Sequence, residues 1–253
     1  FWMRVYEIPE GSKNSKGRAI QNLINIEQDD KVKAFICTQD LKDEDYVNGN
    51  YVIMATKMGQ VKKTSLEQYS RPRSNGINAI TVKDGDELLE AKLTNGNSQI
   101  MLAVKSGKAI RFEENKTRPM GRNASGVRGI RLKDNKDEVV GMISVNDMDA
   151  NILVVSENGY GKRSSLEDYR LTNRGGKGVK TISITEKTGK LVTLKSVSDN
   201  DDLMIINKSG IAIRMQVEDL RVMGRATQGV KVISIKEGDS IAAVAKVMKD
   251  EEE

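Results

Sequence analysis

One pattern recurs four times along this chain and constrains its fold class. Gly59, Gly107, Gly159 and Gly210 each separate two short apolar runs, at intervals of 48 to 52 residues, and Lys or Arg follows each glycine by four positions. A glycine between two such runs is typical of a β-hairpin turn. Repeats of roughly 20–50 residues are typical of solenoids, propellers and arrays. We therefore predict an array of one repeated β unit.

A second glycine marks each copy, because Gly76, Gly126, Gly178 and Gly229 follow the four hairpin glycines in nearly the same register. Each begins a predicted strand of the form glycine, apolar, any, any, isoleucine, at 76–80, 126–130, 178–182 and 229–233. The start of the chain has the same spacing, since Arg4 precedes Gly17 as Lys63 precedes Gly76. We expect the hairpin of that first copy to lie before Phe1. The units are then approximately 1–47, 48–97, 98–149, 150–201 and 202–249, and 250–253 is the expected start of an acidic tail.

Short apolar runs between Gly, Asn, Asp and Ser clusters predict an all-β chain. The fold class that we expect is a propeller-like ring of about six four-stranded blades, with five mostly present here. A linear β-solenoid is the alternative. Asn158 and Gly159 predict a hairpin turn because both residues tolerate positive φ. Helix is expected only as single turns at 65–69 and 165–169.

Composition narrows the class of protein. Hydrophobic residues make up 38% of the chain, and no stretch approaches the roughly 18 consecutive apolar residues of a membrane span. Cys37 is the only cysteine, so a disulfide framework is excluded and a reducing compartment is expected. Histidine is absent, which removes the commonest general base and metal ligand. We predict no catalytic residue and no metal site.

The charges are distributed unevenly. Five windows around the second glycines, 11–26, 69–83, 116–133, 170–180 and 221–236, contain 20 of the 41 basic residues and none of the 36 acidic ones. If the units repeat around a ring, equivalent loops lie on the same rim and form one basic stripe. Duplex DNA is a stiff polyanion that Lys and Arg bind by neutralising phosphates. Glycines beside these cations, as in 174–178, would let a phosphate approach backbone N–H groups.

Aromatic residues are only 4% of the chain and do not alternate with the basic windows. Proteins that bind single strands usually stack bases on aromatic side chains, so duplex DNA is the favoured ligand. The predicted DNA-binding residues are Lys13, Lys16, Arg18, Lys62, Lys63, Arg71, Arg73, Arg118, Arg122, Arg128, Lys162, Arg163, Arg170, Arg174, Lys177, Lys180, Arg221, Arg225 and Lys231.

Several runs resemble the C-terminal domain of the A subunit of bacterial DNA gyrase, a type IIA topoisomerase. They are 5–10 with 16–18, 120–132, 158–163 and 224–230, and the resemblance extends over essentially the whole chain. The family's signature is a box similar to Gln-Arg-Arg-Gly-Gly-Lys-Gly in the first blade. The segment 173–178 is close to it but lies in the fourth unit, so the resemblance implies that the true box lies upstream of Phe1.

The resemblance implies a β-pinwheel that wraps duplex DNA and enables an ATP-driven enzyme to introduce negative supercoils. It implies a bacterial, cytoplasmic, nucleoid-associated protein whose partners are DNA, the N-terminal part of the same polypeptide and the gyrase B subunit, in an A2B2 complex. The isolated domain is expected to be monomeric. ATP and Mg²⁺ would be bound by other domains, and no catalytic residue is carried over to this chain.

Two alternatives remain at this point. The C-terminal domain of the topoisomerase IV A subunit shares the architecture and binds DNA without strong wrapping. A protein-binding propeller would use the same basic loops to bind an acidic partner. The five basic repeats favour wrapping over both.

Overall fold

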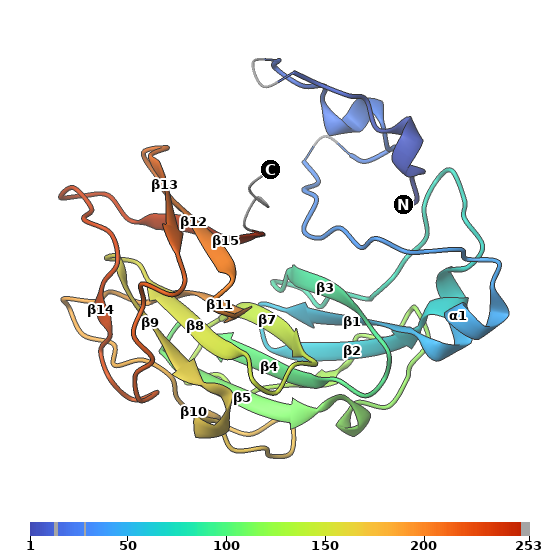
Figure 1. Ribbon diagram of the computed structural model, residues 1–253. Coiled ribbons are helices and arrows are strands. Elements are labelled where there is room, and N and C mark those ends of the chain that lie inside the picture. The colour runs from blue at the N-terminus through green and yellow to red at the C-terminus, as the bar shows by residue number, and fades with distance from the viewer. Residues whose placement is uncertain (13–14, 28, 249–253) are drawn as a thin grey trace.

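The computed structural model describes residues 1–12, 15–27 and 29–248. Within them the chain forms four antiparallel sheets arranged along an arc (Figure 1). The expected all-β, propeller-like fold class is confirmed. The segment 250–253, expected to begin an acidic tail, lies outside the described residues.

Each sheet is built around one of the four predicted hairpins. The first contains β1 (Tyr51–Thr56), β2 (Gln60–Ser65) and β3 (Leu88–Thr94), and the second contains β4 (Gln99–Val104), β5 (Lys108–Glu113) and β7 (Val139–Val145). The third contains β8 (Asn151–Ser156), β9 (Tyr160–Ser165) and β11 (Leu191–Val197), and the fourth contains β12 (Asp201–Asn207), β13 (Ala212–Gln216) and β15 (Ile241–Met248). Consecutive residues of β1, β4 and β8 are buried, so both faces of these central strands pack against other side chains.

Three of the sheets gain a fourth strand from the following repeat unit. β6 (Val127–Arg128) pairs with β2, β10 (Val179–Lys180) with β5, and β14 (Val230–Lys231) with β9. Each begins directly after a second glycine, so the strands expected at these three places are confirmed. Every such blade therefore combines residues of two successive units. β10 and β14 lie on the outer side of the arc, while β7 and β11 lie toward its inside (Figure 1).

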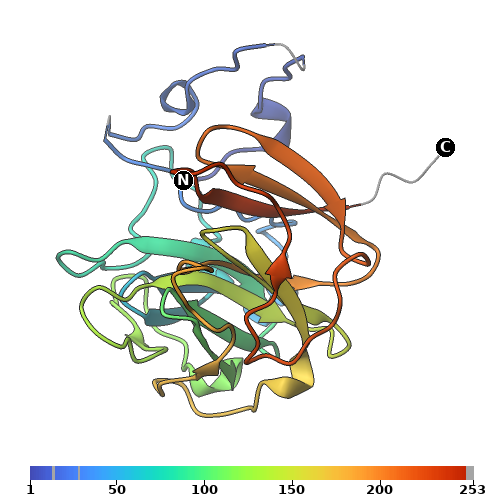
Figure 2. The same cartoon turned by 90° about the vertical axis from the view of Figure 1, so that its left-hand side faces the viewer.

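The described residues before Tyr51 form no strand. They contain 3-10 turns at Val5–Glu7 and Ile20–Asn22 and one short helix, α1 (Glu44–Gly49). A strand after a second glycine pairs with the hairpin of the preceding unit, and this segment contains no hairpin. The predicted strand 76–80 joins no sheet because the unit before it, 1–47, has no hairpin in its described residues for that strand to pair with. The described part of the segment 1–30 runs outside the sheets in both views (Figure 1, Figure 2).

Helices play a small part. Helix α1 was not expected from the sequence, and it begins where the Asp43 side chain accepts a hydrogen bond from the Tyr46 amide at 3.1 Å. The expected single turns are present as 3-10 helices at Leu66–Tyr69 and Leu166–Asp168. None of the helices within the described ranges has the length and hydropathy of a membrane-spanning segment.

Among the described residues, three hydrophobic clusters lie between neighbouring blades, and a fourth lies between the first blade and the N-terminal segment. One cluster joins Ile53 and Val61 of the first sheet to Leu102 and Ile110 of the second, with Ile130 between them. The isoleucines that end the predicted strands at Ile130, Ile182 and Ile233 are all buried. A single unit thus has no core of its own, as expected for a repeat architecture.

Hairpin glycines are required both by their backbone conformation and by the adjacent strand. Gly159 has φ of 78°, and its carbonyl accepts the Val232 amide at 2.9 Å. A Cβ at Gly159 would lie 2.5 Å from the carbonyl oxygen of Ile233. Asn158 does not share the positive φ that the sequence suggested; its side chain instead donates to the carbonyls of Glu186 and Lys187 at 3.1 and 3.2 Å.

Candidate nucleic-acid interface

Four of the five basic windows form one continuous band, and the window 11–26 is not part of it. We call the segments 69–83, 116–133, 170–183 and 221–236 the rim loops. Each rim loop donates a backbone N–H to the next one: Thr81 to Ala124 at 3.3 Å, Arg131 to Gly176 at 2.8 Å, and Ser183 to Thr227 at 3.1 Å. The donor lies five positions after one second glycine, and the acceptor lies two positions before the next. The predicted stripe therefore has a regular backbone hydrogen-bond ladder beneath it.

The hairpins hold the starts of three rim loops, 116–133, 170–183 and 221–236. Met120 donates its amide to the carbonyl of Lys63 at 2.7 Å, and Thr172 donates to that of Arg111 at 2.9 Å. Met223 donates to the carbonyl of Arg163 at 2.8 Å. The basic residue four positions after each of the first three hairpin glycines thus provides the backbone anchor for the following loop.

Most of the predicted DNA-binding residues are exposed. Those on the rim loops are Arg71, Arg73, Arg118, Arg128, Arg170, Lys177, Lys180, Arg221 and Lys231, and Lys16 and Arg18 are exposed in the N-terminal segment. Arg122, Arg174 and Arg225 are half-buried. Lys13 lies outside the described residues. Lys16 and Arg18 belong to the segment that forms no sheet, so the structure does not bring them into the ladder.

Two of the predicted contacts, Lys62 and Lys162, are fully buried at equivalent positions. The Lys62 ammonium donates to the carbonyls of Ala79 and Arg122, and the Lys162 ammonium donates to the carbonyl of Gly224 at 2.6 Å. Burial, together with the nearby charge of Arg122, lowers the pKa of Lys62 to about 8. Burial also lowers the pKa of Lys162 to about 8. These ammonium groups hold the rim loops from inside and do not face solvent.

Lys63 and Arg163, also predicted to contact DNA, are buried one position further along. The Lys63 ammonium lies 3.7 Å from the carboxylate of Glu114 and 4.9 Å from the ring centroid of Tyr51. The Arg163 guanidinium donates to the carbonyl of Leu220 and to the carboxylate of Asp199. Both charges are satisfied within the protein. We therefore leave Lys62, Lys63, Lys162 and Arg163 out of the proposed contact surface.

The glycines of the segment 174–178 serve the contact between units. The Gly175 amide donates to the carbonyl of Gly129 at 2.6 Å, and a Cβ at Gly178 would lie 2.5 Å from the carbonyl oxygen of Ala109. The sequence suggested that these glycines expose N–H groups to a phosphate. The positive φ of Gly175 and Gly178 and their close approach are instead explained by the neighbouring strand and loop, whereas Gly176 is exposed.

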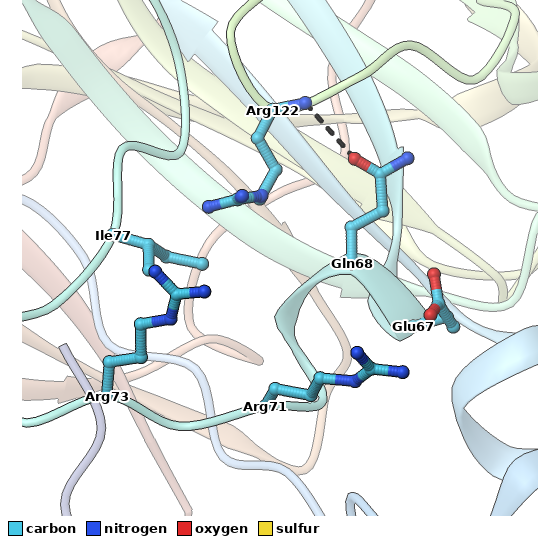
Figure 3. Close-up of a pocket in the computed structure, with 6 residues that line it drawn as sticks. All are labelled: Glu67, Gln68, Arg71, Arg73, Ile77 and Arg122. Carbon is cyan, nitrogen blue, oxygen red and sulfur yellow. Dashed lines mark hydrogen bonds between the residues drawn. The ribbon is translucent and has the colours of Figure 1, made fainter.

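Three arginines surround an open hollow of about 330 Å³ between two rim loops (Figure 3). Arg73 and Arg122 extend into the same space beside Ile77, and Arg71 extends on the side of Glu67 (Figure 3). The Arg122 amide donates to the Gln68 side chain at 3.2 Å. Three guanidinium groups with one exposed carboxylate beside them attract an anion. A phosphate oxygen is the chemical group that this hollow suits.

Three aspartate side chains hold the hairpin turns, a role that our sequence analysis missed. Asp86, Asp137 and Asp239 accept the amide that precedes a hairpin glycine, from Met58, Ser106 and Ser209 at 2.8, 2.9 and 3.3 Å. The Ser209 hydroxyl lowers the pKa of Asp239. The sequence does contain a pattern that could have indicated this role, because each aspartate follows the residue whose amide donates to it by 28 to 31 positions. The residues described here hold no group of three or more metal-ligating His, Cys, Asp or Glu side chains.

Comparison with known proteins agrees with this architecture. The family model for the DNA gyrase C-terminal domain, a β-propeller, matches residues 1–39, 50–95, 99–146, 150–198 and 201–248. The DNA gyrase A subunit of Staphylococcus aureus strain NCTC 8325 is 43% identical over 253 residues, covering 99% of this chain and 28% of that protein.

Two solved structures superpose closely. The C-terminal domain of DNA topoisomerase IV aligns with a TM-score of 0.86 and 25% identity, over 96% of this chain and 74% of that one. The C-terminal domain of DNA gyrase A aligns with a TM-score of 0.80 and 25% identity, over 92% of this chain and 76% of that one. The family match covers most of the chain, and the resemblance read from its motifs is confirmed: this chain belongs to the family of DNA gyrase C-terminal domains.

Proposed function

We propose that this chain binds duplex DNA along its rim loops and bends it around the arc of blades. In this proposal it is the DNA-wrapping part of a DNA gyrase A subunit. The rest of that polypeptide, together with the gyrase B subunit, would supply strand passage and ATP hydrolysis with Mg²⁺, in an A2B2 complex at the bacterial nucleoid. The chain spans 28% of the length of the curated relatives, so these activities belong to the proposal.

The observation that carries the proposal is the ladder that joins acid-free loops into one band. Arg128, Lys177, Lys180 and Lys231 stand exposed along it. Cations at a regular spacing along a curved rigid support can neutralise phosphates over a length of duplex. Such distributed contacts offset the cost of bending, which is a few kcal/mol for a site of about 20–30 base pairs.

The rim loops favour a duplex over a single strand. Tyr69 and Tyr169 at the loop starts are buried, and neither can receive a stacked base. The exposed aromatic side chains Phe1, Tyr6 and Phe35 all lie outside the rim loops. Binding of single strands relies on stacking against exposed aromatic rings. Backbone neutralisation without stacking is the mode that suits a duplex.

The similar proteins can be used to choose between DNA gyrase and topoisomerase IV. The fold superposes on both C-terminal domains, so the architecture does not distinguish them. The sequence does, because the 43% identical relative is a gyrase A subunit. We therefore propose the wrapping function rather than binding alone.

A salt titration tests the proposal. A fluorescent duplex is titrated with the chain at several salt concentrations, and the logarithm of the affinity is plotted against that of the salt concentration. The expected slope is about −0.9 for each neutralised phosphate, so several contacts give a steep line. Lys180→Gln should make the slope less steep, while Lys208→Gln, an equal charge change outside the rim loops, should not. A flat line, or tight binding to an acidic protein alone, would contradict the proposal and support a protein-binding propeller.

A further inference from the structure

The half-buried arginines of the rim loops make a repeated contact that differs from those of the exposed cations. Arg174 and Arg225 each lie four positions before a second glycine. The Arg174 Nη1 donates to the carbonyl of Arg128 at 3.1 Å, and the Arg225 Nη1 donates to the carbonyl of Lys180 at 2.8 Å. Both acceptors lie two positions after the second glycine of the preceding unit. The same bond therefore forms in two independent copies.

The acceptors are themselves residues of the proposed DNA surface. Arg128 ends β6 and Lys180 ends β10, and both side chains are exposed. Each arginine thus holds the backbone of a contact residue in the preceding rim loop. Arg174 makes a second such bond, from Nε to the carbonyl of Lys116 at 2.9 Å. One guanidinium therefore joins its own loop to two points of the neighbouring one.

The chemistry of the side chain suits this task. The rigid guanidinium fork directs Nε and Nη1 in fixed directions, whereas a lysine ammonium is a point donor on a flexible stem. The partners are neutral carbonyls, because the rim loops contain no carboxylate. The bonds therefore fix the spacing between loops without cancelling the positive charge of the band.

Arg122 occupies the same position in the preceding copy but lacks this bond among the described contacts. Its acceptor position, Asn78, lies in the segment 76–80 that joins no sheet. The Arg122 side chain extends instead into the hollow beside Ile77 (Figure 3). The arginine-to-carbonyl bond is thus present where the strand after the second glycine is paired, as in β6 and β10, and is not among the described contacts where that strand is unpaired.

We propose that Arg174 and Arg225 are positioning residues that fix the spacing between neighbouring rim loops and thereby the path of a bound duplex. The phosphates are contacted by the exposed cations that these arginines hold in place. This inference rests on the proposed function and concerns the geometry of binding rather than its existence.

The test separates charge from spacing. Arg174→Lys keeps the charge but loses the fork, Arg174→Ala loses both, and Lys177→Ala removes an exposed charge from the same loop. Salt slopes are measured on a short duplex of about 10 base pairs, which is about 34 Å long at about 3.4 Å per pair. Bending is measured by energy transfer between dyes at the ends of a duplex of about 40 base pairs at saturating protein.

We expect Arg174→Lys and Arg174→Ala to leave the salt slope on the short duplex unchanged and to reduce end-to-end energy transfer on the long one. Lys177→Ala should make the slope less steep by about 0.9 and reduce the bend less than the two Arg174 variants do. Thermal unfolding shows whether each variant is folded, and Arg225→Lys provides the same test in a second copy.

Two results would overturn the inference. One is a slope that becomes less steep by about 0.9 in Arg174→Ala and is restored in Arg174→Lys, which identifies a direct phosphate contact. The other is a bend equal to that of the parent in both lysine variants. A parent chain that does not bind duplex DNA would instead refute the proposed function, so the two failures are distinguishable.

Discussion

Replacing Gly159 by alanine tests how the blades are held together. Gly159 has φ of 78°, and an alanine Cβ there would lie 2.5 Å from the Ile233 carbonyl oxygen and 2.9 Å from the Ile233 Cγ2. The left-handed conformation costs about 1–2 kcal/mol for a residue with a side chain. The Cβ also displaces the strand whose Val232 and Ile233 amides donate to Gly159 at 2.9 and 3.4 Å. Losing two net hydrogen bonds adds about 2 kcal/mol.

Gly210 supplies the matched control. It occupies the same position of the fourth hairpin with φ of 87°, and a Cβ there would meet no atom within 4 Å. Gly210→Ala therefore carries only the backbone strain. The gain from restricting the unfolded chain is the same in both variants and cancels in the comparison.

The assay is urea or thermal unfolding followed by far-UV circular dichroism. We expect Gly159→Ala to be less stable than Gly210→Ala by about 2 kcal/mol, which corresponds to about 4–8 °C in a chain of this size. If the two variants lose equal stability, the strand of the following unit does not lock the hairpin, and our account of the blade contact is wrong.

Three further predictions concern buried charges and the N-terminal segment. Lys63→Met should lower the free energy of unfolding by about 3–5 kcal/mol, because it leaves the buried Glu114 carboxylate without its cation. Adding Glu114→Gln to Lys63→Met should restore part of the lost stability. A loss as small as that caused by replacing a surface lysine would contradict the buried ion pair. Because the pKa of Lys162 is lowered to about 8, its buried charge destabilises the fold fully below pH 8, and this penalty is relieved as pH rises toward the unfolded value near 10.5. The stability of the parent relative to Lys162→Met should therefore increase by up to about 1.4 kcal/mol per pH unit between those values, as measured by urea midpoints at pH 7.5 and 9.5; a constant difference would show that Lys162 does not titrate there. The indole of Trp2, the only tryptophan, donates to the Tyr69 carbonyl at 3.0 Å, so its fluorescence should change when the N-terminal segment leaves the first blade; unaltered emission on unfolding would contradict this contact.

The sequence was sufficient to predict the hairpins and the basic band because both depend on short local patterns. A glycine that adopts positive φ between two apolar runs leaves few alternatives to a hairpin. The loops around Gly126, Gly178 and Gly229 lack acidic residues in every copy, and a repeat places equivalent loops side by side. These features required only the period and the charge of the chain.

The repeat period alone could not show that each of the first three blades receives its fourth strand from the following unit. A two-residue strand such as β6 has too little pattern to show which hairpin it joins, and the partner is chosen by packing of Ile130 against the previous blade. The solvent exposure of individual basic side chains could not be predicted from the sequence either. Lys62 and Lys177 are both lysines near a glycine, yet only the tertiary structure shows that the first is covered by a rim loop and the second is free to meet solvent.

The central claim, that the arc of rim loops bends duplex DNA in one direction, is tested most directly by DNA topology. Nicked circular DNA is sealed by ligase in the presence of increasing amounts of the chain, and the topoisomers are separated after protein removal. We predict a shift in linking number that has one sign, increases to saturation with bound protein, and is reduced in Arg174→Lys. An unchanged topoisomer distribution at protein concentrations that saturate the DNA would contradict the claim.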